Sequence, residues 1–316
     1  FSTSVDIVQD RTGCTIIYPA ADPAWRELAG RIADGLEALG ATQVPLLADT
    51  HAIPHRLGGL PPDLKDRPLI LLGDLNSNRA VFPFYANYYT YCDAMYPGGD
   101  GYELRTIVRP FGGPANSLMV GAATIDGGRA GVQQLLKRLA DLSPGPNVAL
   151  PYMLDVKLGT QLQALFEDII RSAFEQDFSA PTPEFSAALG AATAGEAPAD
   201  ASGNGQTSPT ADLIDYGMAR DRFTSYAHLY FLTGREDLAR RARDWVYYLA
   251  NRGEKDERGI RIADYTMENL AAAWRRVSPA PIFTPEQRLL IDTRMYETVV
   301  KNSTAWWRQP GQIAEI

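Results

Sequence analysis

The sequence is poor in the residues that mark several common classes of protein. Its 316 residues include two cysteines and three histidines. Two thiols cannot make a zinc site alone, and spacing does not decide whether Cys14 and Cys92 stay free or form a disulfide. No apolar run approaches the roughly 18 residues that a membrane-spanning helix needs, so we expect no membrane span.

The chain also lacks any block of basic residues. It has 30 Lys and Arg against 38 Asp and Glu, a net charge of −8. This balance leaves no basic footprint for nucleic acid and no basic cluster for an anionic membrane surface. The sequence opens at Phe1 with no Met, basic region or apolar segment. This start fits a processed or trimmed chain, and a removed signal peptide, which would make the chain secreted or place it at the cell surface, is one explanation.

Motifs for nucleotides, metals and serine nucleophiles are missing. The glycine pairs do not have the G-x-G-x-x-G spacing, no G-K-[ST] occurs, and there is no G-x-S-x-G. His51 and His55 are four residues apart, but Pro54 between them disfavours the helix that would align two metal ligands. We expect no cofactor and no metal.

The first half of the chain has the pattern of an α/β domain. Asp22 and Pro23 predict the start of a helix, Gly40 its end, and residues 126–142 a second helix. Residues 102–111 alternate like a half-exposed strand. Fully or mostly apolar strands are predicted at residues 14–18, 43–49, 67–74 and 116–123.

The second half is helical in pattern. Periodic apolar residues begin at Leu158, and two later helices are expected to meet at residues 232–234. Further helices are expected at 265–277 and from Thr284. Residues 179–210 are rich in Ala, Gly, Pro, Ser and Thr, which indicates a long loop. We therefore predict two domains, 1–157 and 158–316, since the length also favours two.

Residues 74–105 are the most informative segment. Asp74, Asn76, Asn78 and Arg79 follow a buried strand, where α/β sheets usually present ligands. Eight aromatic residues then lie between Val81 and Tyr102, six of them tyrosines. Such rings can pack in a seam between domains, or line the edge of a cleft that contacts sugars. Both interpretations are open from the sequence.

The run "LILLGDLNSNRAVFPFYANYYTYCDAMYPGGDGYELRT", with "MVGAATIDGGRAGVQQLL" after it, resembles the N-terminal α/β domain of secreted heparinase II/III-like proteins. It is also similar in layout to the α/β accessory domain of α-glucuronidases and hexosaminidases. Residues 14–157 carry the likeness. The hairpins after 158, including "AHLYFLTGREDLARRARDWV", look like the opening of an (α/α) toroid. The fold class expected is thus a small, sandwich-like α/β accessory domain followed by a partial (α/α) toroid.

The resemblance implies a carbohydrate-active protein whose partner is a polysaccharide, often one with uronic acids. A lyase of this kind abstracts the proton next to a uronate carboxyl, which needs a base and a group that neutralises the carboxylate. The candidate catalytic residues are Tyr226, His228 and Tyr230. On a helix, Tyr226 and Tyr230 share a face that His228 does not. Candidate substrate-binding residues are Asn76, Asn78, Arg79, Tyr88, Tyr89, Asp100 and Arg105.

The chain departs from that family in two respects. It has fewer helices than a full toroid needs, and Asn302 is followed by Ser303 where an Asn-His motif is expected. Our expectation is the N-terminal portion of a polysaccharide-degrading enzyme, a lyase in preference to a glycoside hydrolase, with catalytic residues beyond this chain. The alternatives are a glycan-binding module without chemistry, and a structural module that self-associates through the tyrosine-rich segment.

Overall fold

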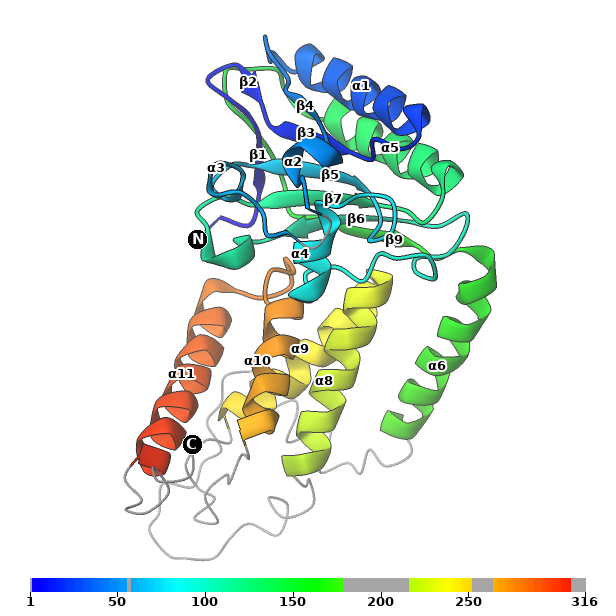
Figure 1. The fold of residues 1–316 in the computed structure, drawn as a ribbon. Helices are drawn as coiled ribbons and strands as arrows, with labels where there is room; N and C mark the ends of the chain where they lie inside the picture. Colours follow the sequence, from blue (N-terminus) through cyan, green and yellow to red (C-terminus); the bar gives the residue numbers. More distant parts are fainter. Residues whose placement is uncertain (1, 56–57, 179–215, 252–263, 308–316) are drawn as a thin grey trace, which may run out of the picture. The chain divides into compact units, whose positions relative to one another are not determined.

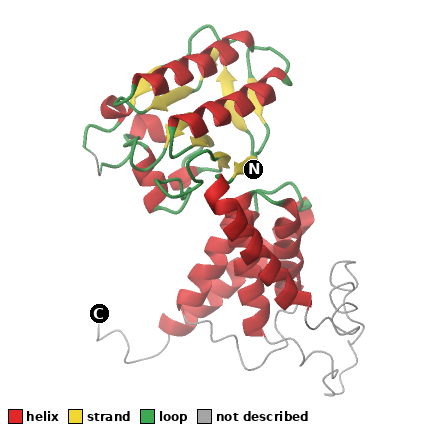
Figure 2. Ribbon diagram, turned by 90° about the vertical axis from the view of Figure 1, so that its right-hand side faces the viewer, coloured by secondary structure: helices red, strands yellow, loops and turns green. Residues whose placement is uncertain are grey.

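The computed structural model describes residues 2–55, 58–178, 216–251 and 264–307 (Figure 1). The chain divides into two compact units. The first comprises Phe1–Ile169 with Leu232–Gly234, and the second comprises Ile170–Phe231 with Arg235–Ile316. Both sheets belong to the first unit, and the described part of the second is built from helices (Figure 2). The protein is therefore a mixed α/β protein in which helices make up about half of the described residues.

The larger sheet has six strands in the order β4-β3-β5-β7-β6-β9. The first four are parallel, and β6 runs antiparallel to both of its neighbours. Its strands are β3 (Thr15–Tyr18), β4 (Leu46–Ala48), β5 (Leu69–Gly73), β6 (Tyr102–Ile107), β7 (Ser117–Gly121) and β9 (Leu154–Lys157). A smaller antiparallel sheet contains β2 (Thr12–Gly13), β1 (Val5–Gln9) and β8 (Val148–Leu150).

Local sequence signals set the two long helices of this unit. At the start of α1 (Pro23–Ala38), the Asp22 side chain accepts a hydrogen bond from the backbone N–H of Ala24 at 2.9 Å. Gly40 follows this helix with φ of 105°, a left-handed conformation that glycine adopts readily. Thr124 caps α5 (Ile125–Ala140) in the same manner. The predicted boundaries of both helices are confirmed within two residues.

Helices cover both faces of the larger sheet. The helices α1 and α5 lie side by side on one face (Figure 1). Alternate strand residues point to opposite faces, so Ile70 and Leu72 pack under these helices whereas Leu69 and Leu71 pack on the other side. That other core is closed by α2 (Asp49–Ala52), α3 (Pro62–Lys65) and α4 (Val81–Ala86). The four strands predicted to be apolar are present.

The prediction of a half-exposed strand at 102–111 is wrong. Every residue of β6 after Tyr102 is buried. The strand lies between β7 and β9, and its polar residues alternate because Glu103 and Arg105 pair with each other inside the protein. The alternating pattern of β6 therefore reflects an internal ion pair and not a solvent-exposed face of the sheet. The strands β1, β2, β8 and β9 were not predicted from the sequence.

The helices after the sheet agree with the sequence pattern. They are α6 (Thr160–Phe178), α8 (Tyr216–Thr233), α9 (Glu236–Asn251), α10 (Asp264–Val277) and α11 (Pro285–Trp307). Gly234, with φ of 67°, follows α8, as the predicted break at 232–234 requires. Thr284 and Gln287 exchange hydrogen bonds at the start of α11, each side chain accepting from the other's backbone N–H. Helix α9 packs against α10 and α11.

Two predictions are not tested by this structure. The low-complexity stretch 179–210 lies outside the described residues, and the domain boundary at 157/158 stays a prediction. Within the described ranges, no helix is both long enough and apolar enough to cross a membrane.

Candidate functional site

The polar side chains that follow β5 mostly hold the backbone of this edge together. Asn78 is fully buried, and its amide donates to the carbonyls of Leu72 and Ile17 at 2.7 and 3.2 Å. Its side-chain oxygen accepts from the N–H of Ala80 at 2.8 Å. Asn78 therefore joins β3 to β5 and starts α4, which gives this predicted binding residue a structural role.

Arg79 and Asn76 differ in how far their side chains are exposed to solvent. The backbone N–H of Arg79 donates to the buried carboxylate of Asp49 at 2.9 Å, and its Nη1 donates to the carbonyl of Pro54 at 2.8 Å. Asn76 is exposed and donates to Asp74 at 3.3 Å. Of the three candidates after β5, Asn76 alone has an exposed side chain.

The glycine-rich turn at residues 97–101 covers the N-terminus of α5. The hydroxyl of Thr124 donates to the carbonyl of Gly99, and a Cβ at Gly127 would collide with the carbonyl oxygen of Gly101. The turn thus occupies the place where a helix N-terminus could bind an anion. Asp100 in this turn accepts from the N–H and hydroxyl of Thr160 at 2.8 and 3.1 Å, and these bonds lower its pKa. Asp100 caps α6.

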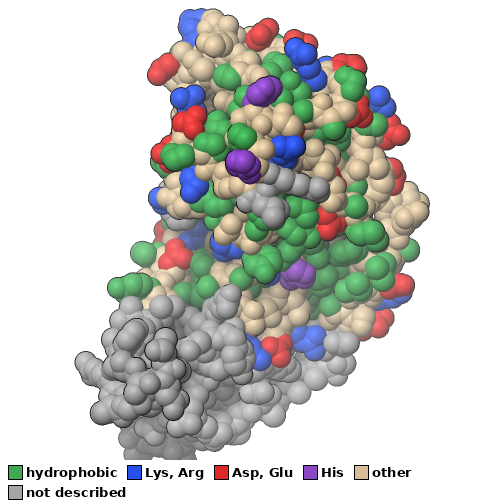
Figure 3. Space-filling model, viewed as in Figure 1, with side chains coloured by type: hydrophobic (Ala, Val, Ile, Leu, Met, Phe, Trp, Pro, Cys, Tyr) green, Lys and Arg blue, Asp and Glu red, His purple; other side chains and the backbone are tan. Residues whose placement is uncertain are grey.

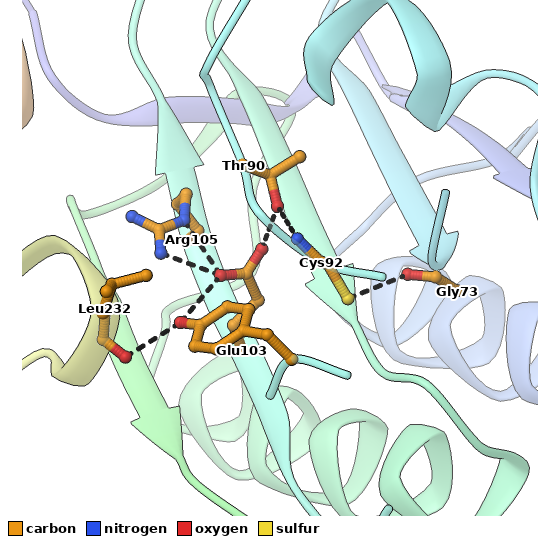
Figure 4. A network of polar contacts seen from close by, with 7 residues as sticks. Gly73, Thr90, Cys92, Glu103, Arg105 and Leu232 are labelled. Carbon is orange, nitrogen blue, oxygen red and sulfur yellow. Dashed lines mark hydrogen bonds and ion pairs between the residues drawn. The ribbon is translucent and has the colours of Figure 1, made fainter. Parts of the chain in front are cut away.

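A buried polar network surrounds Glu103 on β6 (Figure 4). One carboxylate oxygen, Oε2, accepts from Nε and Nη2 of Arg105 at 3.1 and 2.8 Å, and from the hydroxyl of Tyr96 at 3.4 Å. The other oxygen accepts from the hydroxyl of Thr90, which also accepts from the N–H of Cys92. Tyr96 donates to the carbonyl of Leu232 at 2.9 Å.

Burial and the Glu103 charge govern the protonation of this network. Burial opposes the charged form of Arg105, but the charge and hydrogen bond of Glu103, together with Tyr96 and Tyr152, outweigh burial and raise the pKa of the guanidinium. Burial, together with the same carboxylate, raises the pKa of Tyr96 and of Cys92. Arg105 is only 3% exposed and Tyr96 8%. A sugar chain cannot reach these groups, so the candidate Arg105 stabilises the fold in this arrangement.

The two adjacent tyrosines of the predicted set have opposite environments. Tyr89 packs edge-on against Phe84 and Phe111, and its hydroxyl accepts from the N–H of Phe111 at 2.9 Å. Tyr88 is 58% exposed, and its φ of 58° places the backbone in the left-handed region. Such a conformation is unfavourable for a bulky side chain. Tyr89 is partly buried and packs against the core, whereas Tyr88 is directed outward.

Tyr88 is part of a connected group of rings. Its ring centroid lies 6.2 Å from that of Tyr91, which lies 6.4 Å from Tyr85 at an interplanar angle of 89°. The hydroxyl of Tyr85 donates to Asp93 at 2.9 Å. We call Tyr85, Tyr88, Tyr91 and Asp93 the tyrosine surface. It combines ring faces, phenolic hydroxyls and a carboxylate, which are the groups that recognise sugars.

The candidate catalytic residues lie on α8 in the second unit. Tyr226 is 1% exposed and donates to the carbonyl of Ala173 at 3.3 Å, and Tyr230 is 4% exposed. His228 is partly exposed, and burial together with Arg276 lowers its pKa. As expected from helix geometry, the two tyrosines share a buried face. The structure therefore does not bring the three residues together at one accessible site.

Two charged residues of this region were not among the candidates from the sequence. Glu103 is two residues before Arg105 on one strand, so their side chains share a face, and this spacing was the available signal. Asp93 had no such signal.

In the part of the chain that the structure describes, no three His, Cys, Asp or Glu residues gather to hold a metal ion. On the face shown in Figure 3, described basic and acidic side chains are interspersed.

No known protein family matches this chain, and a search of curated proteins finds no match either.

Proposed function

We propose that the α/β unit binds polysaccharide through the tyrosine surface. The observation that carries this proposal is Tyr88, a large ring 58% exposed on a left-handed backbone. Strained backbone at a non-glycine residue concentrates at functional positions, and exposed aromatic faces are suited to stack on the C–H faces of sugars. Tyr91 and Tyr85 extend the ring group beside it, so more than one sugar unit can be contacted.

The resemblance of residues 14–157 to heparinase II/III-like proteins supports the same class of partner. We propose accordingly that the chain is the accessory portion of a secreted or cell-surface carbohydrate-active protein. The succession of α8 and α9 across Gly234 is consistent with the beginning of an (α/α) toroid. In this proposal, the α/β unit holds the polymer for chemistry performed by helical elements.

A second candidate function is β-elimination by a polysaccharide lyase, and His228 favours it. A histidine with a lowered pKa is neutral near pH 7 and can accept a proton from a sugar carbon. Tyr226 and Tyr230 are too buried to share that reaction.

Binding is tested with the whole chain by titration calorimetry against a panel of soluble polysaccharides. Tyr88→Ala is expected to weaken binding by about 1 kcal/mol, or about fivefold, the size of an aromatic ring contact. The matched control is Tyr296→Ala, which removes a tyrosine 70% exposed on α11. It should leave affinity unchanged. Absence of binding to every polymer, or equal loss in both variants, contradicts the proposal.

The lyase reaction is tested by the ultraviolet absorbance of unsaturated uronate ends. A rising signal that His228→Ala abolishes supports the second candidate. Turnover unchanged in that variant removes His228 from it. A role in assembly is distinguished by sedimentation, since a structural module would change its mass when Tyr88 is replaced and would bind no sugar.

A further inference from the structure

The tyrosine surface lies in a segment whose charges all have one sign. Residues 80–104 contain no Lys, Arg or His, and they contain three acidic residues, Asp93, Asp100 and Glu103. Glu103 is neutralised inside the protein by Arg105, and Asp100 caps α6. Asp93 is the acidic residue that touches the ring group, through Tyr85.

The contacts of Asp93 leave one position for an incoming donor. Its Oδ1 accepts from the backbone N–H groups of Met95 and Tyr96 at 2.8 and 3.0 Å. Its Oδ2 accepts from the hydroxyl of Tyr85 at 2.9 Å. An ionised carboxylate offers about four acceptor positions, so the hydrogen bonds among the described residues leave one position on Oδ2. Asp93 is partly exposed, and among the described residues it has no ion pair.

The negative charge of Asp93 acts on the ring group directly. Burial raises the pKa of Tyr85, and the hydrogen bond to Asp93 and the charge of that carboxylate raise it further. A second negative charge brought to the same place experiences the same repulsion. Only a donor group improves the contact.

We infer that the tyrosine surface takes uncharged sugars and discriminates against uronic acids. This inference rests on the proposed glycan binding and narrows its substrate class. A neutral sugar presents hydroxyl donors to Oδ2 of Asp93, while the ring group connected to Asp93 through Tyr85 offers faces on which sugar units stack. A uronate at the same position brings a carboxylate that cannot donate. Two unit charges about 4 Å apart in water repel by about 1 kcal/mol, which corresponds to about fivefold in affinity.

The tyrosine surface would then take a different class of sugar from the uronic acids that the family resemblance implies. If the polymer contains both kinds of residue, the tyrosine surface contacts its neutral units. The uronate units would then be bound by other groups of the protein.

The experiment compares two oligosaccharides of equal length and linkage, one neutral and one oxidised to the carboxylate at C6. Dissociation constants are measured by calorimetry for the whole chain, for Asp93→Asn and for the control Asp34→Asn. Asp34 is exposed on α1, on the opposite face of the sheet. The unmodified chain is expected to prefer the neutral sugar about fivefold. Asp93→Asn should reduce that preference toward one, and Asp34→Asn should leave it unchanged.

A salt titration of the unmodified chain tests the same point without any substitution. Ions screen exposed charges, so the preference for the neutral sugar should shrink as salt rises. A tighter complex with the uronate overturns the inference and leaves glycan binding intact. A preference that neither salt nor Asp93→Asn alters also overturns it. Binding of neither sugar contradicts the proposed function itself.

Discussion

Arg105 and Glu103 form an ion pair inside the first unit. Nη2 and Nε of Arg105 both donate to Oε2 of Glu103, at 2.8 and 3.1 Å, and the two side chains are 3% and 0% exposed. Their spacing of two residues on β6 directs them to the same face of the sheet. The pair lets a central strand contain two charged residues, because each charge is desolvated only together with its partner.

Removing one partner of this pair should be strongly destabilising. Arg105→Met leaves Glu103 as a buried charge without its cation, and we expect a loss of about 3–5 kcal/mol in the free energy of unfolding. Chemical denaturation measures it. The control is Arg129→Met, which removes the exposed pair with Asp126 and should change stability by less than about 1 kcal/mol. Equal effects would show that the buried pair contributes little.

The two adjacent tyrosines should respond in opposite directions. Tyr88→Gly relieves a left-handed backbone conformation and removes few contacts, so stability should rise by about 1 kcal/mol. Tyr89→Phe removes the hydroxyl that accepts from the N–H of Phe111 and should lower stability by about 1 kcal/mol. The midpoint temperatures of thermal unfolding of both variants, compared with the unmodified chain, test these two expectations. A destabilised Tyr88→Gly would place that ring among stabilising contacts.

Both cysteines should be inert in the folded protein. Burial raises the pKa of Cys14 to about 12, and burial together with Glu103 raises that of Cys92. The thiolate is the reactive form, so a thiol reagent should label neither residue until the chain unfolds. Both are free thiols in separate cores on opposite faces of the sheet. Two labelled cysteines per chain in denaturant, and none before, is the expected count. Rapid labelling of the native protein would contradict it.

The stability of the helical unit should fall in mild acid because of His228. Its pKa in the folded state lies below the ordinary value of 6.5, through burial and the neighbouring Arg276. The unfolded chain therefore binds the proton more readily, and stability decreases as pH falls through that value. One proton gives a slope of at most about 1.4 kcal/mol per pH unit.

Denaturation of the whole chain between about pH 8 and about pH 5 measures this slope, which His228→Gln should reduce. His51→Gln, at an exposed position of α2, is the matched control and should leave the slope unchanged. A slope that persists in the His228 variant would assign the acid sensitivity to carboxylates.

Most of the long elements follow from local patterns. The apolar stripe from Trp25 to Leu39 is entirely buried, and the helix starts at Asp22 and Thr284 have the expected hydrogen bonds. These signals are readable because each depends on residues within about one turn of one another. The short strands β1 and β8 pair across more than a hundred residues, which no local period records.

The sequence by itself determined the two long helices and the strands β3 to β7 of the larger sheet, together with the later helices, and it identified residues 74–105 as the segment richest in candidate chemistry. Tertiary structure alone decided what each side chain there does. Asn78 became a link between strands, Arg105 an internal cation, and Tyr88 an exposed ring beside the packed Tyr89. The reason is physical. Exposure and pairing depend on neighbours brought close by folding, such as Phe111 for Tyr89 and Thr90 for Glu103, and not on adjacent residues.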